Sequence, residues 1–251
     1  MYRQFSETPA TCSDAALGSV ASPLECAHCA VRGRAICAAL SSTEMAALDE
    51  VTSSHPYSAG TTLVRTGETR QYVYTVTSGA LRMVRTLADG RRQITGFVLP
   101  GDYVGLTGTP RHRHDIEAIV DSRVCRTSCV HMRQLRERYP SLERKLLQRT
   151  SMELAAAQDT GLVLARLQPS ERLANFLLRL AARSTQPGMP GDTVPLPMGR
   201  GDIADHLGLT METVSRTFTK LKQQQLIALP QLHVVQILDY AGLRELAGDE
   251  L

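Results

Sequence analysis

The chain is poor in several features that would place it in a familiar class. Its 251 residues include no tryptophan and only 4% aromatic residues, so stacking platforms for single-stranded nucleic acid are not expected. The formal net charge is only +3, so any binding to nucleic acid must come from a local cluster of basic residues. No apolar run approaches the length of a membrane span, and no membrane partner is expected.

The first residues, MYRQFSETPATCSD, lack the apolar core of a secretory signal. We therefore expect a cytoplasmic protein whose thiols stay reduced. Neither a Gly-x-Ser-x-Gly nor a His-Glu-x-x-His motif occurs, so the sequence gives no sign of a hydrolase, and we do not expect an enzyme.

Half of the cysteines lie in one short segment, ECAHCAVRGRAIC, with the spacing C-x2-C-x7-C. This segment has too few large apolar residues to form a core of its own. Clustered thiols in a reducing compartment indicate a metal or cluster site rather than small buried hydrophobic side chains. The clustered residues are Cys26, Cys29 and Cys37, whereas Cys12, Cys125 and Cys129 lie apart.

Changes in residue composition and pattern along the chain predict four parts. Ser41 and Glu44 form a capping-box pattern at the start of a short helix. From about 55 to 130, short runs rich in Val, Ile, Thr and Tyr alternate with glycine turns, which predicts a β-barrel. The expected parts are a tail with the cysteine segment (1–40), a barrel (41–131), a long helical region (132–167) and a C-terminal domain (168–251).

The long helix carries a narrow apolar stripe with the 3.5-residue period of a coiled coil. Packing on the barrel would also explain such a stripe. A long helix between two domains, however, more often faces a copy of itself, so we expect a homodimer. The stripe comprises Leu147, Thr150, Leu154, Ala157, Gly161 and Leu164.

Residues 199–224, GRGDIADHLGLTMETVSRTFTKLKQQ, predict a helix-turn-helix. Gly208 would break the first helix by taking a left-handed conformation. Thr210 would cap the second helix, whose buried stripe would be Val214, Phe218 and Leu221. The following LIALPQLHVVQILD predicts two short strands, a plausible wing.

Polar side chains concentrate on the outer face of this second helix, in the turns that meet base edges in such a domain. Arginine can bond guanine O6 and N7 together, glutamate can accept from the cytosine amino group, and serine can bond several bases. An ordinary helical hairpin would also expose charges, but not this chemistry at this position. The predicted contacts to double-stranded DNA are Glu212, Thr213, Ser215, Arg216, Lys220 and Lys222.

From about residue 24 to 248 the chain resembles the Crp–Fnr regulators, and within them the Fnr branch of bacterial oxygen-responsive regulators. RRQITGFVLPGDYVG and RGDIADHLGLTMETVSR carry the resemblance. It implies an α+β fold: a cyclic-nucleotide-binding-like jelly roll, a long dimerisation helix and a C-terminal winged helix-turn-helix. It also implies RNA polymerase as a partner, and TTGAT-type half-sites read by the E-x-x-S-R motif at Glu212, Ser215 and Arg216.

The same resemblance implies a [4Fe–4S] cluster on Cys26, Cys29, Cys37 and Cys125, with the loss of the cluster in oxygen weakening the dimer. Cys129 lies four positions from Cys125 in an expected strand, so the two cannot both bind one small cluster, and Cys129 is expected to be filler. Fnr proteins often carry an acidic residue where this chain has Ala157, so its oxygen response is expected to be blunted or tuned elsewhere.

Other cofactors and classes stay open from the residues alone. Zinc could bind the thiols, with His28 as a possible fourth ligand. A regulator that senses haem-bound nitric oxide needs no thiols, and an iron–sulfur electron carrier needs no helix-turn-helix. Cyclic nucleotide binding is disfavoured, because Gly101-Asp102 replaces the Gly-Glu of that branch and RHRHDIEA lacks its Arg-Ser pair.

Overall fold

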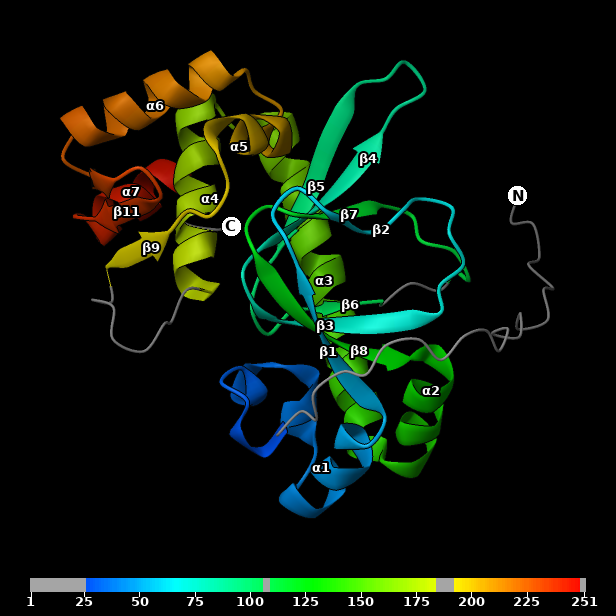
Figure 1. Cartoon of the computed structure of the whole chain (residues 1–251). Coiled ribbons are helices and arrows are strands. Elements are labelled where there is room, and N and C mark those ends of the chain that lie inside the picture. The colour runs from blue at the N-terminus through cyan, green and yellow to red at the C-terminus, as the bar shows by residue number, and fades with distance from the viewer. Residues whose placement is uncertain (1–25, 106–108, 184–191, 249–251) are drawn as a thin grey trace, which may run out of the picture. The chain divides into compact units, whose positions relative to one another are not determined.

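The computed structural model describes residues 26–105, 109–183 and 192–248. Cys12 and most of the predicted tail lie outside these residues. The expected architecture is confirmed: antiparallel sheets of a jelly roll precede a long helix and a C-terminal helix-turn-helix (Figure 1). Among the described residues, no helix combines the length and the hydropathy needed to cross a membrane.

The chain forms two compact units. The first comprises the described residues up to Arg85 and those between Phe97 and Thr150, and the second comprises Thr86–Gly96 and the described residues from Ser151 onward. Residues 86–96 of one barrel hairpin therefore belong to the second unit, and the long helix belongs partly to each unit.

Two four-stranded antiparallel sheets form the jelly roll, in the orders β1-β8-β3-β6 and β2-β7-β4-β5. The β4–β5 turn contains the predicted Asp89-Gly90 pair, and Gly90 has a φ of 85°, which glycine adopts without strain. The strands are β1 (Thr52–Tyr57), β2 (Thr62–Val64), β3 (Tyr72–Ser78), β4 (Leu81–Thr86), β5 (Arg92–Val98), β6 (Tyr103–Val104), β7 (Asp115–Ala118) and β8 (Ser122–Ser128).

The first unit has two hydrophobic cores, one on each face of the sheet that contains β8. Side chains alternate between faces along a strand. Val124 therefore packs in the barrel core with Val76 and Leu81, whereas Cys125 points to the opposite face. The second core lies there, and joins the cysteine segment to α1 (Ser42–Asp49), α2 (Cys129–Arg138) and the start of α3 (Pro140–Arg166).

Local sequence signals explain the ends of these helices. The capping box at Ser41 is confirmed: its hydroxyl accepts from the Glu44 amide, and the Glu44 carboxylate accepts from the Ser41 amide at 2.8 Å. The expectation that Cys129 continues a strand is wrong. Ser128 accepts a hydrogen bond from the His131 amide and caps α2, so Cys129 is the first residue of a helix.

In the second unit, α4 (Pro169–Arg183) packs against α6 (Met211–Gln223) and α7 (Tyr240–Ala247). The wing contains a third strand besides the two predicted. Burial of Leu173, Leu177 and Leu180 on one face of α4 forms the centre of this domain. The remaining elements are β9 (Thr193–Pro195), α5 (Arg200–Leu207), β10 (Ile227–Gln231) and β11 (Val234–Ile237).

Candidate functional site

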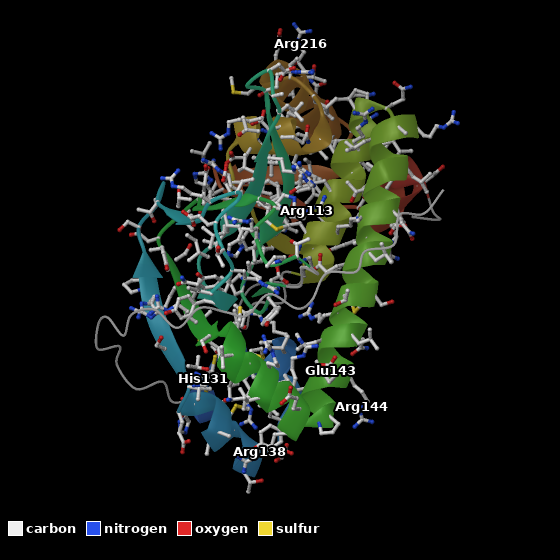
Figure 2. The ribbon with its side chains drawn as sticks, turned by 90° about the vertical axis from the view of Figure 1, so that its right-hand side faces the viewer. Arg113, His131, Arg138, Glu143, Arg144 and Arg216 are labelled. Atoms are coloured by element: carbon white, nitrogen blue, oxygen red, sulfur yellow. The ribbon has the colours of Figure 1, made fainter. Side chains whose placement is uncertain are left out.

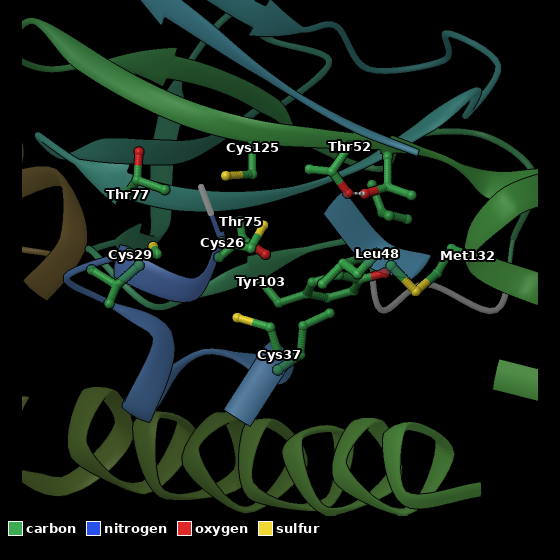
Figure 3. Close-up of a pocket in the computed structure, with 14 residues that line it drawn as sticks. Cys26, Cys29, Cys37, Leu48, Thr52, Thr75, Thr77, Tyr103, Cys125 and Met132 are labelled. Carbon is green, nitrogen blue, oxygen red and sulfur yellow. Dashed lines mark hydrogen bonds between the residues drawn. The ribbon is translucent and has the colours of Figure 1, made fainter. Parts of the chain in front are cut away.

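The structure brings the cysteine segment and β8 together around one cavity in the first unit (Figure 3). The cavity has a volume of about 480 Å³, including its opening to solvent. Cys26, Cys29, Cys37 and Cys125 all line it. The other lining side chains are apolar or bear only hydroxyls: Val31, Ile36, Leu48, Thr52, Val73, Thr75, Thr77, Tyr103, Thr127 and Met132.

Three short 3-10 turns hold the first three thiols in place, at Cys26–His28, Arg32–Arg34 and Ile36–Ala39. Successive backbone hydrogen bonds connect them, from the Cys29 amide to the Cys26 carbonyl at 3.4 Å and from the Arg32 amide to the Cys29 carbonyl at 3.0 Å. Ile36, buried in the second core, anchors the segment beside α1 and α2. Tight turns thus let closely spaced cysteines face one cavity.

Burial disfavours the charged form of these thiols. It raises the pKa of Cys125 to about 12, and the nearby Cys29 and Cys37 thiols raise it further. Burial also raises the pKa of Cys26, with a further contribution from a hydrogen bond to Asp49. The Cys37 pKa is raised by burial and by Cys29. Each affected thiol responds to another, so the four form one electrostatic group.

Cys129 belongs elsewhere. Its thiol donates to the Arg70 carbonyl at 3.4 Å and does not line the cavity. His28 is exposed and is also absent from the cavity lining, so the pocket does not offer a site of three thiols and His28. Within the described parts of the chain, no three His, Cys, Asp or Glu side chains already stand at metal-binding separations.

The donor set nevertheless fits a cluster. Four thiols are the ligands that a [4Fe–4S] centre uses, one for each iron. They reach the cavity from different walls, and apolar residues surround them. Sequence reasoning missed one charged group here, Asp49. Its carboxylate contributes to the raised pKa of Cys26 and of Cys125, and its Oδ1 is buried without a hydrogen-bond partner within the described structure. Its position at the end of a helix gave no signal of this role.

The helix-turn-helix in the second unit has the predicted geometry. Gly208 takes the left-handed conformation (φ 63°, ψ 40°), and the Thr210 hydroxyl accepts from the Thr213 amide at 3.1 Å. Val214, Phe218 and Leu221 are buried as expected, together with Thr217, whose hydroxyl donates to the Thr213 carbonyl at 2.7 Å. Back-bonding of this hydroxyl made a polar residue acceptable in the buried stripe, which hydrophobic periodicity alone missed.

The predicted DNA-contacting residues lie on the opposite side of α6, and Arg216 projects away from the ribbon (Figure 2). Arg216 Nη2 and Glu212 Oε1 form an exposed ion pair at 2.6 Å, so both side chains are accessible to a partner on the surface of α6. Lys220 reaches Ser170 at 3.3 Å, and Lys222 is exposed. Thr213 is half-buried and completes the helix cap, which makes it the least accessible of the set.

A further cation, Arg200, connects the two helices of the helix-turn-helix. Its guanidinium lies 3.2 Å from the centroid of the Phe218 ring. Burial lowers its pKa to about 10, so it remains charged at neutral pH. Arg200 begins α5 and Phe218 lies in α6, so this contact supports α6 on its buried face. The sequence places the two far apart and gave no sign of the pair.

The long helix α3 exposes large apolar side chains along its length. Leu147 is 68% exposed and Leu154, seven residues later, is 61% exposed. Leu164 differs from the rest of the predicted stripe, because it is half-buried and lines a small cavity beside Arg172 within the second unit. The exposed part of the stripe therefore ends before Leu164.

Comparison with known proteins agrees with this architecture. The family described as the Crp-like helix-turn-helix domain matches residues 171–246, and the cyclic nucleotide-binding domain matches residues 54–139. The chain is 38% identical to the nitrogen fixation regulation protein FixK of Bradyrhizobium diazoefficiens, over 89% of this chain and 94% of that protein. It is 35% identical to the transcriptional activator protein FnrL of Cereibacter sphaeroides, over 90% and 92%.

A solved structure supports the same assignment. The structure of FixK2 from Bradyrhizobium japonicum has a TM-score of 0.73 and 36% identity, covering 78% of this chain and 97% of that one. Relatives named FixK and relatives named FnrL are about equally similar. Overall similarity therefore does not choose between them, and the residues of the cysteine pocket must decide what is sensed.

Proposed function

Since the chain belongs to the Crp–Fnr family of DNA-binding transcription regulators, we propose that it senses oxygen through an iron–sulfur cluster and binds a TTGAT-type palindrome as a homodimer. One observation carries the sensing part: Cys26, Cys29, Cys37 and Cys125 line a single apolar cavity. When bound there, a [4Fe–4S] cluster supplies a reaction with oxygen that ends in loss of the cluster.

The pocket explains why the four residues would act together. Three of the thiols, those of Cys26, Cys37 and Cys125, resist ionisation when metal-free, because burial raises their pKa. Binding to iron compensates the charge of the thiolates, so the ligand and the closed conformation of the segment stabilise each other. Without the cluster, the segment would be held by the burial of Ile36 and by its three 3-10 turns.

A direct contact connects this segment to the dimerisation helix. Arg149 on α3 donates a hydrogen bond of 2.5 Å to the carbonyl of Arg34, which lies between Cys29 and Cys37. Arg149 is flanked by Leu147 and Thr150 of the apolar stripe. A conformational change in the cysteine segment would thus alter α3 where it contacts the α3 helix of a second copy. The exposure of Leu147 and Leu154 supports this part of the proposal, because a second α3 would remove both from water.

The DNA part rests on α6. Arg216 would bond guanine and Glu212 would accept from a cytosine amino group, with Ser215 beside them. Lys220, Lys222 and the start of the helix at Thr213 would lie near the backbone. Pairing of two copies places two such helices on half-sites about one helical turn apart. RNA polymerase remains a predicted partner of the bound dimer.

Analysis of anaerobically purified protein tests the sensing proposal. We expect about four iron and four sulfide per chain, with a broad visible absorption that disappears in air. Stoichiometric zinc without sulfide would contradict the proposal, and a haem spectrum would assign sensing to another group. DNA binding is tested separately in the same preparation, with a TTGAT-type palindrome.

A further inference from the structure

Threonine hydroxyls surround Cys125 on the sheet face that forms one wall of the cysteine cavity. Thr75, Thr77 and Thr127 line this cavity together with Cys125. Thr75 on β3 is the direct partner of Cys125 in the register of β3 and β8. Residues opposite each other in an antiparallel pair point to the same face, with Cβ atoms about 4.5–5.5 Å apart. The Thr75 side chain therefore lies next to that of Cys125 at the cavity wall (Figure 3).

Thr75 differs from the other lining threonines in its hydrogen bonds. The Thr127 hydroxyl shares a hydrogen bond of 2.8 Å with the Thr52 hydroxyl, and the Thr77 hydroxyl donates to the Arg123 carbonyl at 3.0 Å. Within the described part of the chain, the Thr75 hydroxyl makes no hydrogen bond. Among the threonines that line the cavity, Thr75 thus keeps its proton available for a group inside the cavity.

We propose that Thr75 is a positioning residue whose hydroxyl donates a hydrogen bond to the Cys125 thiolate when that thiolate binds a metal. The inference rests on the proposed function, because it takes Cys125 as a metal ligand. A metal-bound thiolate is a negatively charged acceptor, and hydrogen bonds to the ligand sulfurs tune both the affinity and the electronic properties of a metal centre. Rotation about χ1 is enough to turn a threonine hydroxyl towards a neighbouring side chain.

The test compares the full-length wild type with Thr75→Val, Thr75→Ser and Thr77→Val. Metal-free protein is titrated anaerobically with cobalt(II), whose thiolate charge-transfer absorption reports both the affinity and the electron donation from sulfur. Thr75→Val keeps the shape and removes the donor, so cobalt should bind about tenfold more weakly and its charge-transfer band should move to longer wavelength. Thr75→Ser keeps the donor, so its affinity should stay within about threefold of wild type, with the band unchanged.

Thr77→Val is the matched control, because it removes a hydroxyl from the same strand and the same cavity, but one that is already bonded to the Arg123 carbonyl. It should change neither the affinity nor the band. Wild-type affinity and an unchanged band in Thr75→Val would overturn the proposal. Equal losses in Thr75→Ser and Thr75→Val would also overturn it, because the methyl group and packing would then account for the effect. Circular dichroism checks folding, and Thr75→Ala removes the same hydroxyl if the valine variant does not fold.

A double-mutant cycle with Cys125→Ser identifies the acceptor. Thr75→Val should have little effect on cobalt affinity in the Cys125→Ser background. An effect as large as in the wild-type background would mean that the hydroxyl acts on another ligand, and the assignment would be wrong. Iron and sulfide analysis of anaerobic protein keeps the two proposals apart. If the protein holds neither, oxygen sensing by a cluster fails, whereas the cobalt titration still decides the role of Thr75.

Discussion

The cysteine pocket encloses its thiols in a hydrophobic core, whereas α6 exposes its functional side chains to solvent. In the pocket, burial raises the pKa of Cys26, Cys37 and Cys125, so their chemistry depends on a bound ligand. On α6, Glu212 and Arg216 are more than 70% exposed and already paired as charged groups. Under the proposed function, a change of state would therefore begin in the pocket, and the two α6 helices would follow the arrangement of the dimer.

The largest effect is expected from removing one thiol. Cys37→Ser should leave too few thiolates to hold a [4Fe–4S] cluster, so iron and sulfide should fall from about four towards zero. Metal analysis and visible absorption of anaerobic protein measure this. Cys129→Ser is the control and should keep both, because its thiol bonds the Arg70 carbonyl outside the cavity. Loss of the cluster in the Cys129→Ser protein would mean that Cys129 belongs to the ligand set.

The second prediction concerns the surface of α3. Leu154→Glu places two like charges in an apolar seam and should give monomers, measured by sedimentation under anaerobic conditions. Leu87→Glu is a matched control, since Leu87 is 47% exposed on the β4–β5 hairpin. A Leu154→Glu protein that remains dimeric would place the interface elsewhere.

The third prediction separates base reading from general attraction. Arg216→Ala should cost about 1–3 kcal/mol at each half-site and leave nonspecific binding nearly unchanged. Affinities for the TTGAT-type palindrome and for one with replaced guanines give the comparison. Equal losses on both sequences would show that Arg216 contacts only phosphate.

A smaller and uniform effect is expected from the lysines further along α6. Lys222→Ala should weaken binding to all sequences alike and lower the salt slope by about one unit for each phosphate that the side chain no longer neutralises. Lys220→Ala should act similarly, and it also removes the hydrogen bond to Ser170. A change of sequence preference in either variant would move that lysine into the base-reading set.

The smallest effect concerns pH. Burial lowers the pKa of His206, whose Nδ1 lies 3.1 Å from the Ile94 carbonyl, while that carbonyl opposes the shift and Arg179 adds to it. The folded state thus binds its proton less readily than the unfolded state, and stability falls as pH drops below about 6.5, by less than about 1.4 kcal/mol per pH unit. Denaturant unfolding from pH 8 to pH 5 should show a flatter profile for His206→Phe. Identical profiles would assign the pH dependence to other histidines.

The two regions also differ in how far the sequence predicts them. The helix-turn-helix depends on local sequence: the left-handed Gly208, the Thr210 cap and the buried Val214 follow from neighbours within one turn. Even there, buried Thr217 and the distant Arg200–Phe218 contact escaped periodicity, because hydroxyl back-bonding and a cation–aromatic contact leave no apolar pattern.

The pocket is formed by residues far apart in the sequence. The sequence therefore predicted a site with several thiols, but not which residues line it. The clustered thiols were visible, but the choice of Cys125 over Cys129 came from a family resemblance. The structure gives the physical basis: Cys125 faces the cavity from β8, whereas Cys129 begins α2 after the Ser128 cap. Asp49 could not be found by spacing, because only folding packs α1 against the turn that begins at Cys26.

We propose that the state of the cysteine pocket controls DNA binding by α6, and one paired measurement tests this directly. Anaerobic full-length protein is titrated onto a labelled TTGAT-type palindrome, and the same sample is titrated again after air has removed its visible absorption. We expect affinity to fall at least about tenfold, together with a shift from dimer to monomer, since each copy then binds DNA without the help of its partner. Unchanged affinity after complete loss of iron and sulfide would contradict the account.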